Sequence, residues 1–356
     1  MAREAAERAR QFCDRFGLRL PILLAPMAGA CPASLSIAVG QAGGMGAMGA
    51  LPSSPDAIRR WAADVRAGTS GPFQLNTWMP DPVPLRVAEA EARVRAFLAS
   101  WGPAVPATAG DSLPPDAGAQ CDAFLDVRPA AVSTIMGVLP PDYVTRLKDA
   151  GIPWFATVTT LAEARDAVLA GADVIVAQGF EAGGHRGAFD AAAAERQAVG
   201  LFALVPRLAD QIERPIVAAG GIGSGRGIAA ALTLGASAVM MGTVFLRCPE
   251  AHTHPAWANA LENLEPEDTT STRAFTGRLG RAIATNYVRA AAEADAPSPA
   301  PYPVQRGLTA PMKEAGAAAN DHHRMQVWAG QAAAMAAPIP AADLVARLWR
   351  DAEHHL

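Results

Sequence analysis

Short apolar runs alternate with segments of helical periodicity along most of the chain. From Leu20 onward, eight runs rich in Val, Ile, Leu, Ala and Gly contain no charged residue. Strands that are apolar on both faces are typical of a parallel sheet covered by helices on both sides. The pattern therefore predicts an α/β fold, a (β/α)8 or TIM barrel. The expected strands are Leu20–Ala25, Gly44–Ala47, Phe73–Asn76, Ala131–Ile135, Trp154–Thr157, Val174–Ala177, Ile216–Ala219 and Ala238–Met241.

Helix-start signals precede the segments between these strands. Ser54 lies just before a helix expected over Ala57–Ala67. Thr160 is followed three residues later by Glu163, which is the pattern of a capping box, and the helix behind it ends at Gly171. Such signals satisfy backbone N–H groups that have no partner within the helix. They support the alternation of strand and helix that a barrel requires.

Two segments depart from the alternation, and both follow the carboxyl ends of barrel strands. The first contains a charged helix, Leu85–Ser100, and a loop rich in Pro, Gly and Ala, Gly102–Gly118. The second runs from Arg247 to a terminal helix expected to begin around Met325. Because both leave the same end of the barrel, we expect a mainly helical lid over its mouth. The expected barrel comprises residues 1–80, 125–245 and 325–356, and the lid or substrate-binding insertions comprise residues 81–124 and 246–324.

Composition and charge narrow the class of protein. The 356 residues are 51% hydrophobic and 18% charged, and 30 Lys+Arg face 34 Asp+Glu. These values exclude a disordered chain and argue against a nucleic-acid partner. The first apolar run is short and interrupted by Pro21 and Pro26, so we expect no signal peptide, no membrane contact and a cytoplasmic location, and a homodimer is possible. Scattered cysteines predict reduced thiols: they are Cys13, Cys31, Cys121 and Cys248.

Two consecutive strands end in small residues. Gly220 and Gly221 follow one apolar run, and Gly242 and Thr243 follow the next. Backbone N–H groups can converge on a phosphate only where no Cβ intervenes, and the last strands of a barrel commonly form a phosphate site. An ordinary glycine-rich turn is the alternative for either strand end, but the pair favours a bound phosphate. A Rossmann turn is disfavoured because no acidic residue ends the following strand.

Other strand ends offer residues for a flat heterocycle. The first strand ends in a rigid turn formed by Ala25, Pro26 and Met27. This turn could form the floor of a pocket for a flat ring and offer a backbone N–H to a ring nitrogen. Asn76 and Gln178 each carry a donor and an acceptor that suit the edge of a heterocycle. The alternative for the Ala25–Met27 turn is a strand that simply ends at a proline. The alternative for Asn76 and Gln178 is that each side chain caps its own loop.

His185 is the candidate catalytic residue. It follows two glycines in a loop after the sixth strand, where an imidazole can lie over the barrel mouth and transfer a proton. Glu181 and Arg186 could orient it or bind an anion, or could form an ordinary loop ion pair. Without carboxylates at ligand spacing, we expect no metal site at the other histidine pairs. These pairs are His252 with His254 and His322 with His323.

Several of these segments together resemble the nitronate monooxygenase family, formerly called 2-nitropropane dioxygenases. The resemblance extends from about Leu20 to Gln331, and the element from Gln178 to Gly187 is its most specific part. The segments that carry it are Ala25–Gly29, Gln178–Gly187, Ala219–Ile222, Gly225–Gly227, Met240–Thr243, Phe275–Arg278 and Trp328–Gln331.

The resemblance implies a TIM-barrel flavoprotein that binds FMN without a covalent bond. It implies that His185 is the catalytic base, and it suggests Lys313 and Tyr302 as substrate residues. The flavin-binding positions that it implies are Ala25, Pro26, Met27, Asn76, Gln178, Gly183, Gly220, Gly221, Met240, Met241, Gly242 and Thr243.

We therefore expect FMN-dependent oxidation of alkyl nitronates, or of nitroalkanes, by O2 to a carbonyl compound and nitrite. His185 would deprotonate a neutral nitroalkane or hydrogen-bond the nitro oxygens. The chain departs from the family at Thr134–Met136, at Met240 and over residues 104–123, which leaves the substrate open. One alternative is an FMN-dependent NAD(P)H:quinone or enoyl-acyl-carrier-protein reductase. A TIM-barrel isomerase or lyase acting on a sugar phosphate is another.

Overall fold

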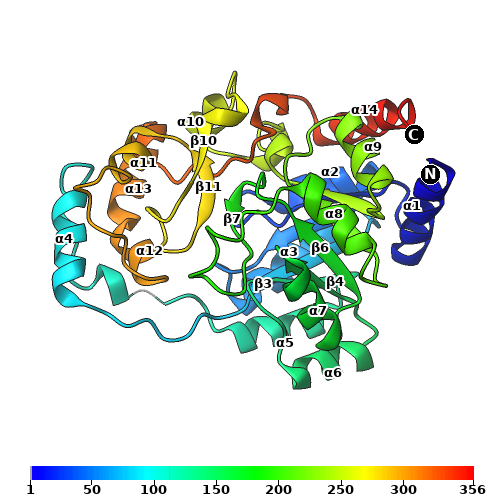
Figure 1. Ribbon diagram of the computed structural model, residues 1–356, viewed down its shortest axis with the longest axis horizontal. Helices are drawn as coiled ribbons and strands as arrows, with labels where there is room; N and C mark the ends of the chain where they lie inside the picture. The colour runs from blue at the N-terminus through cyan, green and yellow to red at the C-terminus, as the bar shows by residue number, and fades with distance from the viewer. Residues whose placement is uncertain (1, 112) are drawn as a thin grey trace.

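The computed structural model describes residues 2–111 and 113–356, and its centre is a parallel eight-stranded sheet. The strand order is β1-β9-β8-β6-β5-β4-β3-β2, and a bridge between Leu23 and Met45 joins the two edge strands. The sheet therefore closes into a barrel (Figure 1), as predicted. Its strands are β1 Ile22–Leu24, β2 Gly46–Gly49, β3 Phe73–Trp78, β4 Ala131–Ile135, β5 Trp154–Val158, β6 Val174–Gln178, β8 Ile216–Ala219 and β9 Ala238–Met241.

Helices surround the barrel and bury the outward side chains of its strands. Ser54 Oγ accepts a hydrogen bond from Ala57 N at 3.3 Å, and Thr160 Oγ1 accepts one from Glu163 N at 3.2 Å, so both predicted caps form. The Glu163 carboxylate accepts a hydrogen bond from Thr159 N at 2.6 Å. The outer helices are α2 Ala33–Gln41, α3 Pro55–Gly68, α5 Ala117–Val127, α6 Pro141–Asp149, α7 Leu161–Leu169, α8 Leu201–Ala209, α9 Gly225–Thr233 and α14 Ala341–Glu353.

Helix α1, Ala2–Phe16, closes one end of the barrel. Its Phe12 and Phe16 are buried with Phe155 of β5, and the rings of Phe16 and Phe155 lie 5.1 Å apart. In Figure 1 the helix lies beside the carboxyl terminus, opposite the lid. The functional site of such barrels is at the carboxyl ends of the strands, which is the other, open end here.

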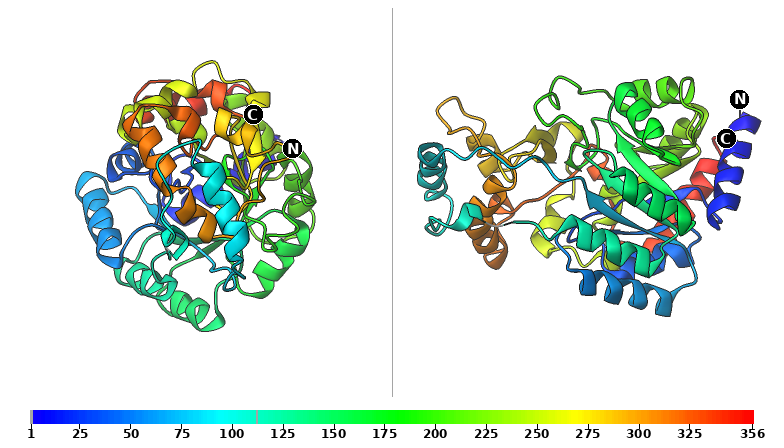
Figure 2. Two further views of the ribbon diagram at one scale, coloured as in Figure 1. Left: turned by 90° about the vertical axis from the view of Figure 1, so that its left-hand side faces the viewer. Right: turned by 90° about the horizontal axis from the view of Figure 1, so that it is seen from below.

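The two predicted insertions pack against each other at that open end. Helix α4, Ala88–Leu98, shares an apolar cluster with α11, Asn286–Ala290, α12, Val304–Leu308, and α13, Ala310–Ala318. The right-hand view of Figure 2 shows these helices projecting beyond one end of the barrel. A short helix, α10, lies at Pro255–Ala260. A three-stranded antiparallel sheet links lid and barrel; its strands are β7 Gly184–His185, β10 Thr269–Thr272 and β11 Gly280–Ile283.

The prediction of a terminal helix beginning around Met325 is wrong. Trp328 instead forms an antiparallel bridge with Ala282, and Gly330 N donates to Thr243 Oγ1 at 3.0 Å. The helix begins only at Ala341. A glycine and two later prolines interrupt helical hydrogen bonding in this stretch, so tertiary contacts decide its path. Within the described residues, we find no helix with the length and apolarity needed to cross a bilayer.

Candidate active site

A cavity of about 420 Å³ opens at the carboxyl ends of the barrel strands and extends beneath the lid. Its size is in the range of pockets for small ligands and cofactors. Nearly all the predicted site residues meet in its wall, although they come from distant parts of the chain. They are Ala25, Pro26, Met27, Asn76, Gln178, Gly183, His185, Gly220, Gly221, Met240, Met241, Gly242, Thr243 and Tyr302.

One end of the cavity is built from the bare backbone that follows β8 and β9. Gly220 and Gly221 have φ values of 115° and 67°, which residues other than glycine rarely adopt. A Cβ on Gly220 would lie 3.0 Å from Ala182 N, and one on Gly242 would lie 3.2 Å from Ala25 Cβ. The geometry leaves room for a ligand against this backbone, near the start of α9. We call the backbone of Gly220, Gly221, Gly242 and Thr243 the glycine cradle; it suits a phosphate.

The turn after β1 forms an apolar floor, but its backbone N–H groups already have partners. Ala25 N donates to Met241 O at 2.8 Å, and Met27 N donates to Cys31 Sγ at 3.3 Å. Burial raises the pKa of the Cys31 thiol to about 12, so this group stays protonated. Pro26 has no N–H. The expectation that this turn offers a free N–H to a ring nitrogen is therefore not met at these three residues.

The two carboxamides differ in what they leave free. Gln178 Nε2 donates to His185 O at 3.0 Å, and Gln178 Oε1 accepts from Gly187 N at 2.7 Å. Gln178 therefore caps its own loop, which was the alternative interpretation. Asn76 Nδ2 donates to Ser133 Oγ at 3.0 Å. Its Oδ1 has no protein partner among the described residues, so Asn76 is the freer of the two toward a ligand.

His185 lies between two indole rings in the cavity wall. Its ring centroid is 4.6 Å from that of Trp78 and 4.8 Å from that of Trp328, and its Nε2 lies 2.8 Å from Thr276 Oγ1. His185 is one of the residues that line the cavity. Burial, and then the charges of Arg278, Lys313 and Arg306, lower the pKa of His185 to about 3. The imidazole is therefore neutral at physiological pH.

The loop that carries His185 is held from behind by Arg186. Its Nη1 donates to Gln178 O at 2.7 Å, and its Nη2 donates to Gln197 O at 2.9 Å. Glu181 accepts from Leu201 N at 2.9 Å, at the start of α8. Neither residue reaches the His185 ring, and no ion pair joins Arg186 and Glu181 in the described structure. Both residues fix the loop backbone rather than binding an anion.

The lid contributes the opposite wall of the cavity. The Tyr302 ring lies 5.6 Å from the Trp78 ring, and its buried hydroxyl has no hydrogen-bond partner in the described structure. Lys313 does not line the cavity. Its Nζ donates to Gln326 Oε1 at 3.1 Å and to Arg306 O at 3.4 Å, so it lies behind two residues that do. Burial lowers the pKa of Lys313 to about 8.

Sequence reasoning assigned no individual role to several residues of this wall. Thr276 and Trp328 lie in segments that carry the family resemblance, and that was the only signal for them. Trp78, Arg306 and Gln326 had none: Trp78 ends barrel strand β3, and the folding of the lid brings Arg306 and Gln326 to the cavity. Spacing along the chain does not reveal such contacts.

His254, His322 and His323 have structural partners. His254 Nδ1 accepts from Ala256 N at 3.2 Å and caps α10, while His323 Nδ1 accepts from Asn286 N at 3.4 Å. The rings of His322 and His323 stack with their centroids 4.1 Å apart. Across residues 2–111 and 113–356, no group of three or more His, Cys, Asp or Glu residues could hold a metal ion.

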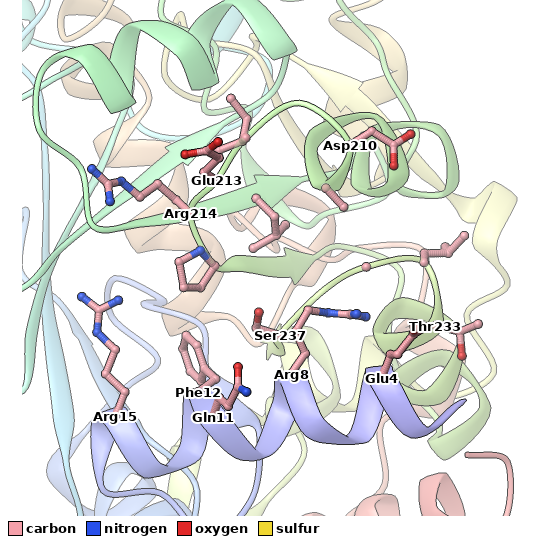
Figure 3. Close-up of a pocket in the computed structure, with 16 residues that line it drawn as sticks. Glu4, Arg8, Gln11, Phe12, Arg15, Asp210, Glu213, Arg214, Thr233 and Ser237 are labelled. Atoms are coloured by element: carbon pink, nitrogen blue, oxygen red, sulfur yellow. The ribbon is translucent and has the colours of Figure 1, made fainter. Parts of the chain in front are cut away.

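A second hollow, of about 660 Å³, lies at the closed end of the barrel (Figure 3). Arg8, Phe12 and Arg15 of α1 face a loop that carries Arg214. Arg8 Nη2 donates to Leu232 O at 2.6 Å, which ties α1 to the barrel. None of the predicted site residues lies here. The cavity around His185 is therefore the candidate active site.

Comparison with known proteins gives a consistent result. A profile of the nitronate monooxygenase family matches residues 11–351. A nitronate monooxygenase of Paraburkholderia phytofirmans is 39% identical, covering 96% of this chain and 94% of that one. One of Pseudomonas aeruginosa is 38% identical, covering 94% and 98%.

Solved structures with the same architecture extend this result. A nitroalkane oxidase from Streptomyces ansochromogenes has a TM-score of 0.87 and 34% identity, covering 97% of this chain and 98% of that one. FabK from Thermotoga maritima has a TM-score of 0.75 and 26% identity, covering 97% and 96%. The family profile spans nearly the whole chain, and both the barrel and the lid take part in the structural matches. The chain therefore belongs to the nitronate monooxygenase family and is an oxidoreductase of that type.

Proposed function

We propose that this protein uses FMN to oxidise alkyl nitronates with O2 to a carbonyl compound and nitrite. The observation that carries the proposal is the position of His185. Its neutral imidazole is hydrogen-bonded to Thr276 in the same cavity that contains the glycine cradle. The cradle suits a phosphate, and the imidazole suits a small oxygen-rich group. Membership of the family supports the same reaction.

The residues present fit FMN. The left-handed Gly220 and Gly221 and the backbone of Gly242 and Thr243 would hold the phosphate, because a Cβ at any of these glycines would approach neighbouring atoms or fill the cradle. The apolar turn from Ala25 to Met27 would contact the flavin ring, with Asn76, Gln178 and Gly183 beside it. Bound FMN would supply the electron-transfer chemistry and the reaction with O2.

His185 would hold the substrate as a hydrogen-bond donor. Thr276 Oγ1 lies 2.8 Å from Nε2 and 3.3 Å from Arg278 O, so the direction of the first hydrogen bond depends on the tautomer of the ring. In the tautomer that places the ring proton on Nδ1, this N–H can donate to a nitronate oxygen. A residue whose conjugate acid has a pKa of about 3 is a weak base toward a neutral nitroalkane. The substrate that this geometry favours is therefore the preformed nitronate.

An absorbance spectrum of the purified protein, followed by anaerobic addition of a nitronate and then of NADPH, tests the proposal. We expect a yellow protein that nitronate reduces and NADPH does not, with nitrite released in air. Reduction by NADPH alone would instead establish a reductase, and absence of flavin even after FMN is added would refute both.

The Thr276→Val variant tests how His185 is oriented. Losing one hydrogen bond to the ring should lower kcat/KM for ethyl nitronate about fivefold, because a neutral hydrogen bond contributes about 1 kcal/mol. FMN content should not change, and Thr276→Ser should restore the rate. Steady-state nitrite release measures the effect. Equal loss in the valine and serine variants would show that the hydroxyl has no positioning role.

Lys313 should give the reaction a pH dependence on the alkaline side. Its pKa of about 8 means that it is charged below pH 8 and neutral above it. KM for ethyl nitronate should therefore rise about two- to fivefold between pH 7 and 9.5, as the positive charge near the cavity is lost. Lys313→Met should abolish this rise and keep the high KM throughout, whereas exposed Lys148→Met should not alter it. A rise that persists in Lys313→Met would assign it to another group.

A further inference from the structure

Arg306 differs from the other arginines of the lid. Arg278 pairs with Asp81, Arg86 with Glu91, and Arg324 with Asp321. The guanidinium of Arg306 makes no hydrogen bond or ion pair within residues 2–111 and 113–356, yet Arg306 lines the cavity. A guanidinium presents five N–H donors in a planar fork. Its natural partner here is a ligand.

The groups beside Arg306 are also donors. The Lys313 ammonium group can only donate, and it donates to Gln326 Oε1. The two N–H groups of Gln326 Nε2 are therefore left without a protein partner within the described residues. The buried Tyr302 hydroxyl has no partner either. Buried polar groups are nearly always hydrogen-bonded, so a ligand or water must satisfy this hydroxyl.

No carboxylate balances these donors in the described part of the cavity wall. Arg306 and Lys313 form no ion pair within the described residues, although the Glu314 carboxylate favours the charged form of Lys313. Both act on the His185 ring, which is itself neutral. In a partly buried site an unbalanced positive charge favours an anion strongly. The donors and the charge therefore come from the same part of the wall, the lid segments that carry Tyr302, Arg306 and Gln326.

We propose that Arg306, with Tyr302 and Gln326, forms an oxyanion subsite and that Arg306 selects anionic substrates. The inference rests on the proposed function, because it assigns the subsite to the substrate end of the same cavity. The bound group is a planar oxyanion, which is either the nitronate itself or a carboxylate carried on the same substrate. A guanidinium binds both bidentately.

The test compares Arg306→Gln, Arg306→Lys and Arg93→Gln in the purified holoenzyme. Arg93 is a matched control, since it is an exposed lid arginine paired with Glu89 on the surface of α4. Substrates are ethyl nitronate and a nitronate of similar length that carries a terminal carboxylate. Nitrate, a planar oxyanion, is the binding probe and is titrated by calorimetry, which does not depend on turnover.

Arg306→Gln should raise KM about 10- to 100-fold with little change in kcat, and should weaken nitrate binding in parallel. Arg306→Lys should recover part of both losses, and Arg93→Gln should match the unaltered protein. Equal losses on the two substrates would assign the subsite to the nitronate oxygens, and a larger loss on the carboxylated one would assign it to the carboxylate.

Unaltered KM and nitrate affinity in Arg306→Gln would overturn the subsite while nitronate oxidation by the unaltered protein still stood. Failure of the unaltered protein to oxidise any nitronate would refute the proposed function. In that case, weaker nitrate binding by Arg306→Gln would still support an oxyanion site, because the calorimetric measurement does not require catalysis.

Discussion

His185→Ala is expected to lower kcat/KM for ethyl nitronate by about 10²- to 10³-fold, which is the usual cost of removing one preorganised donor from a charge-stabilising site. The FMN content should not change, because the ring contacts Trp78, Trp328 and Thr276 rather than the glycine cradle. Nitrite release under steady-state conditions measures the rate, and the flavin absorbance measures the cofactor.

The protonation state of His185 gives this prediction a second part. With a pKa of about 3, the ring is neutral from pH 5.5 to 8, and it gains a proton only as the pH approaches 3. The rate on nitronate should therefore show no inflection near pH 6.5, where an ordinary histidine titrates.

A comparison of substrates separates the two roles that the sequence left open. As a hydrogen-bond donor to the nitro group, His185 should matter to a similar degree for ethyl nitronate and for nitroethane. A much larger loss on nitroethane in His185→Ala, together with an inflection near pH 6.5 in the unaltered protein, would instead make the residue a general base.

Gly242→Val is expected to weaken FMN binding about 100-fold and to yield a colourless, inactive protein. A Cβ at this position would lie 3.2 Å from both Ala25 Cβ and Met27 Sδ, and the two branches of valine would extend into the cradle. Overpacking of this kind typically costs about 1–3 kcal/mol, and the lost phosphate contacts add to it. Titration of the apoprotein with FMN, followed by flavin fluorescence, measures the affinity.

Gly227→Ala is the matched control in the neighbouring helix. A Cβ there would meet nothing nearer than Ile222 Cγ2 at 3.5 Å, an ordinary contact, so FMN affinity and activity should be retained. Thermal unfolding of both variants distinguishes loss of the site from loss of the fold. A folded Gly242→Val protein that binds FMN normally would remove this strand end from the phosphate site.

The barrel was predictable because its signals are local. A strand covered on both faces excludes charged side chains, and all eight uncharged, largely apolar runs became barrel strands. The segment after Met325 shows the limit of such reasoning. Its apolar and small residues can continue a helix, but Trp328 pairs with Ala282 and Gly330 contacts Thr243, which the local pattern does not encode.

The site was predictable to the extent that it lies at strand ends. Gly220 and Gly242 follow strands directly, and His185 lies in the loop segment after β6, so the barrel itself brings them together. Thr276, Arg306 and Gln326 reach the cavity only through the fold of the lid. Lys313 was suggested by the family resemblance, but its buried amine donates to Gln326 Oε1 and Arg306 O and acts through those neighbours.

Strand β7 has a consequence for how substrate enters. It carries His185, and it pairs with β11 of the lid, where Gly280 lies opposite His185 and Arg281 lies opposite Gly184; Arg186 N also donates to Leu279 O at 2.9 Å. A rigid swing of the lid away from the barrel would break this pairing and displace the imidazole. The pairing therefore favours substrate exchange by local movements of wall side chains over a hinge motion of the whole lid.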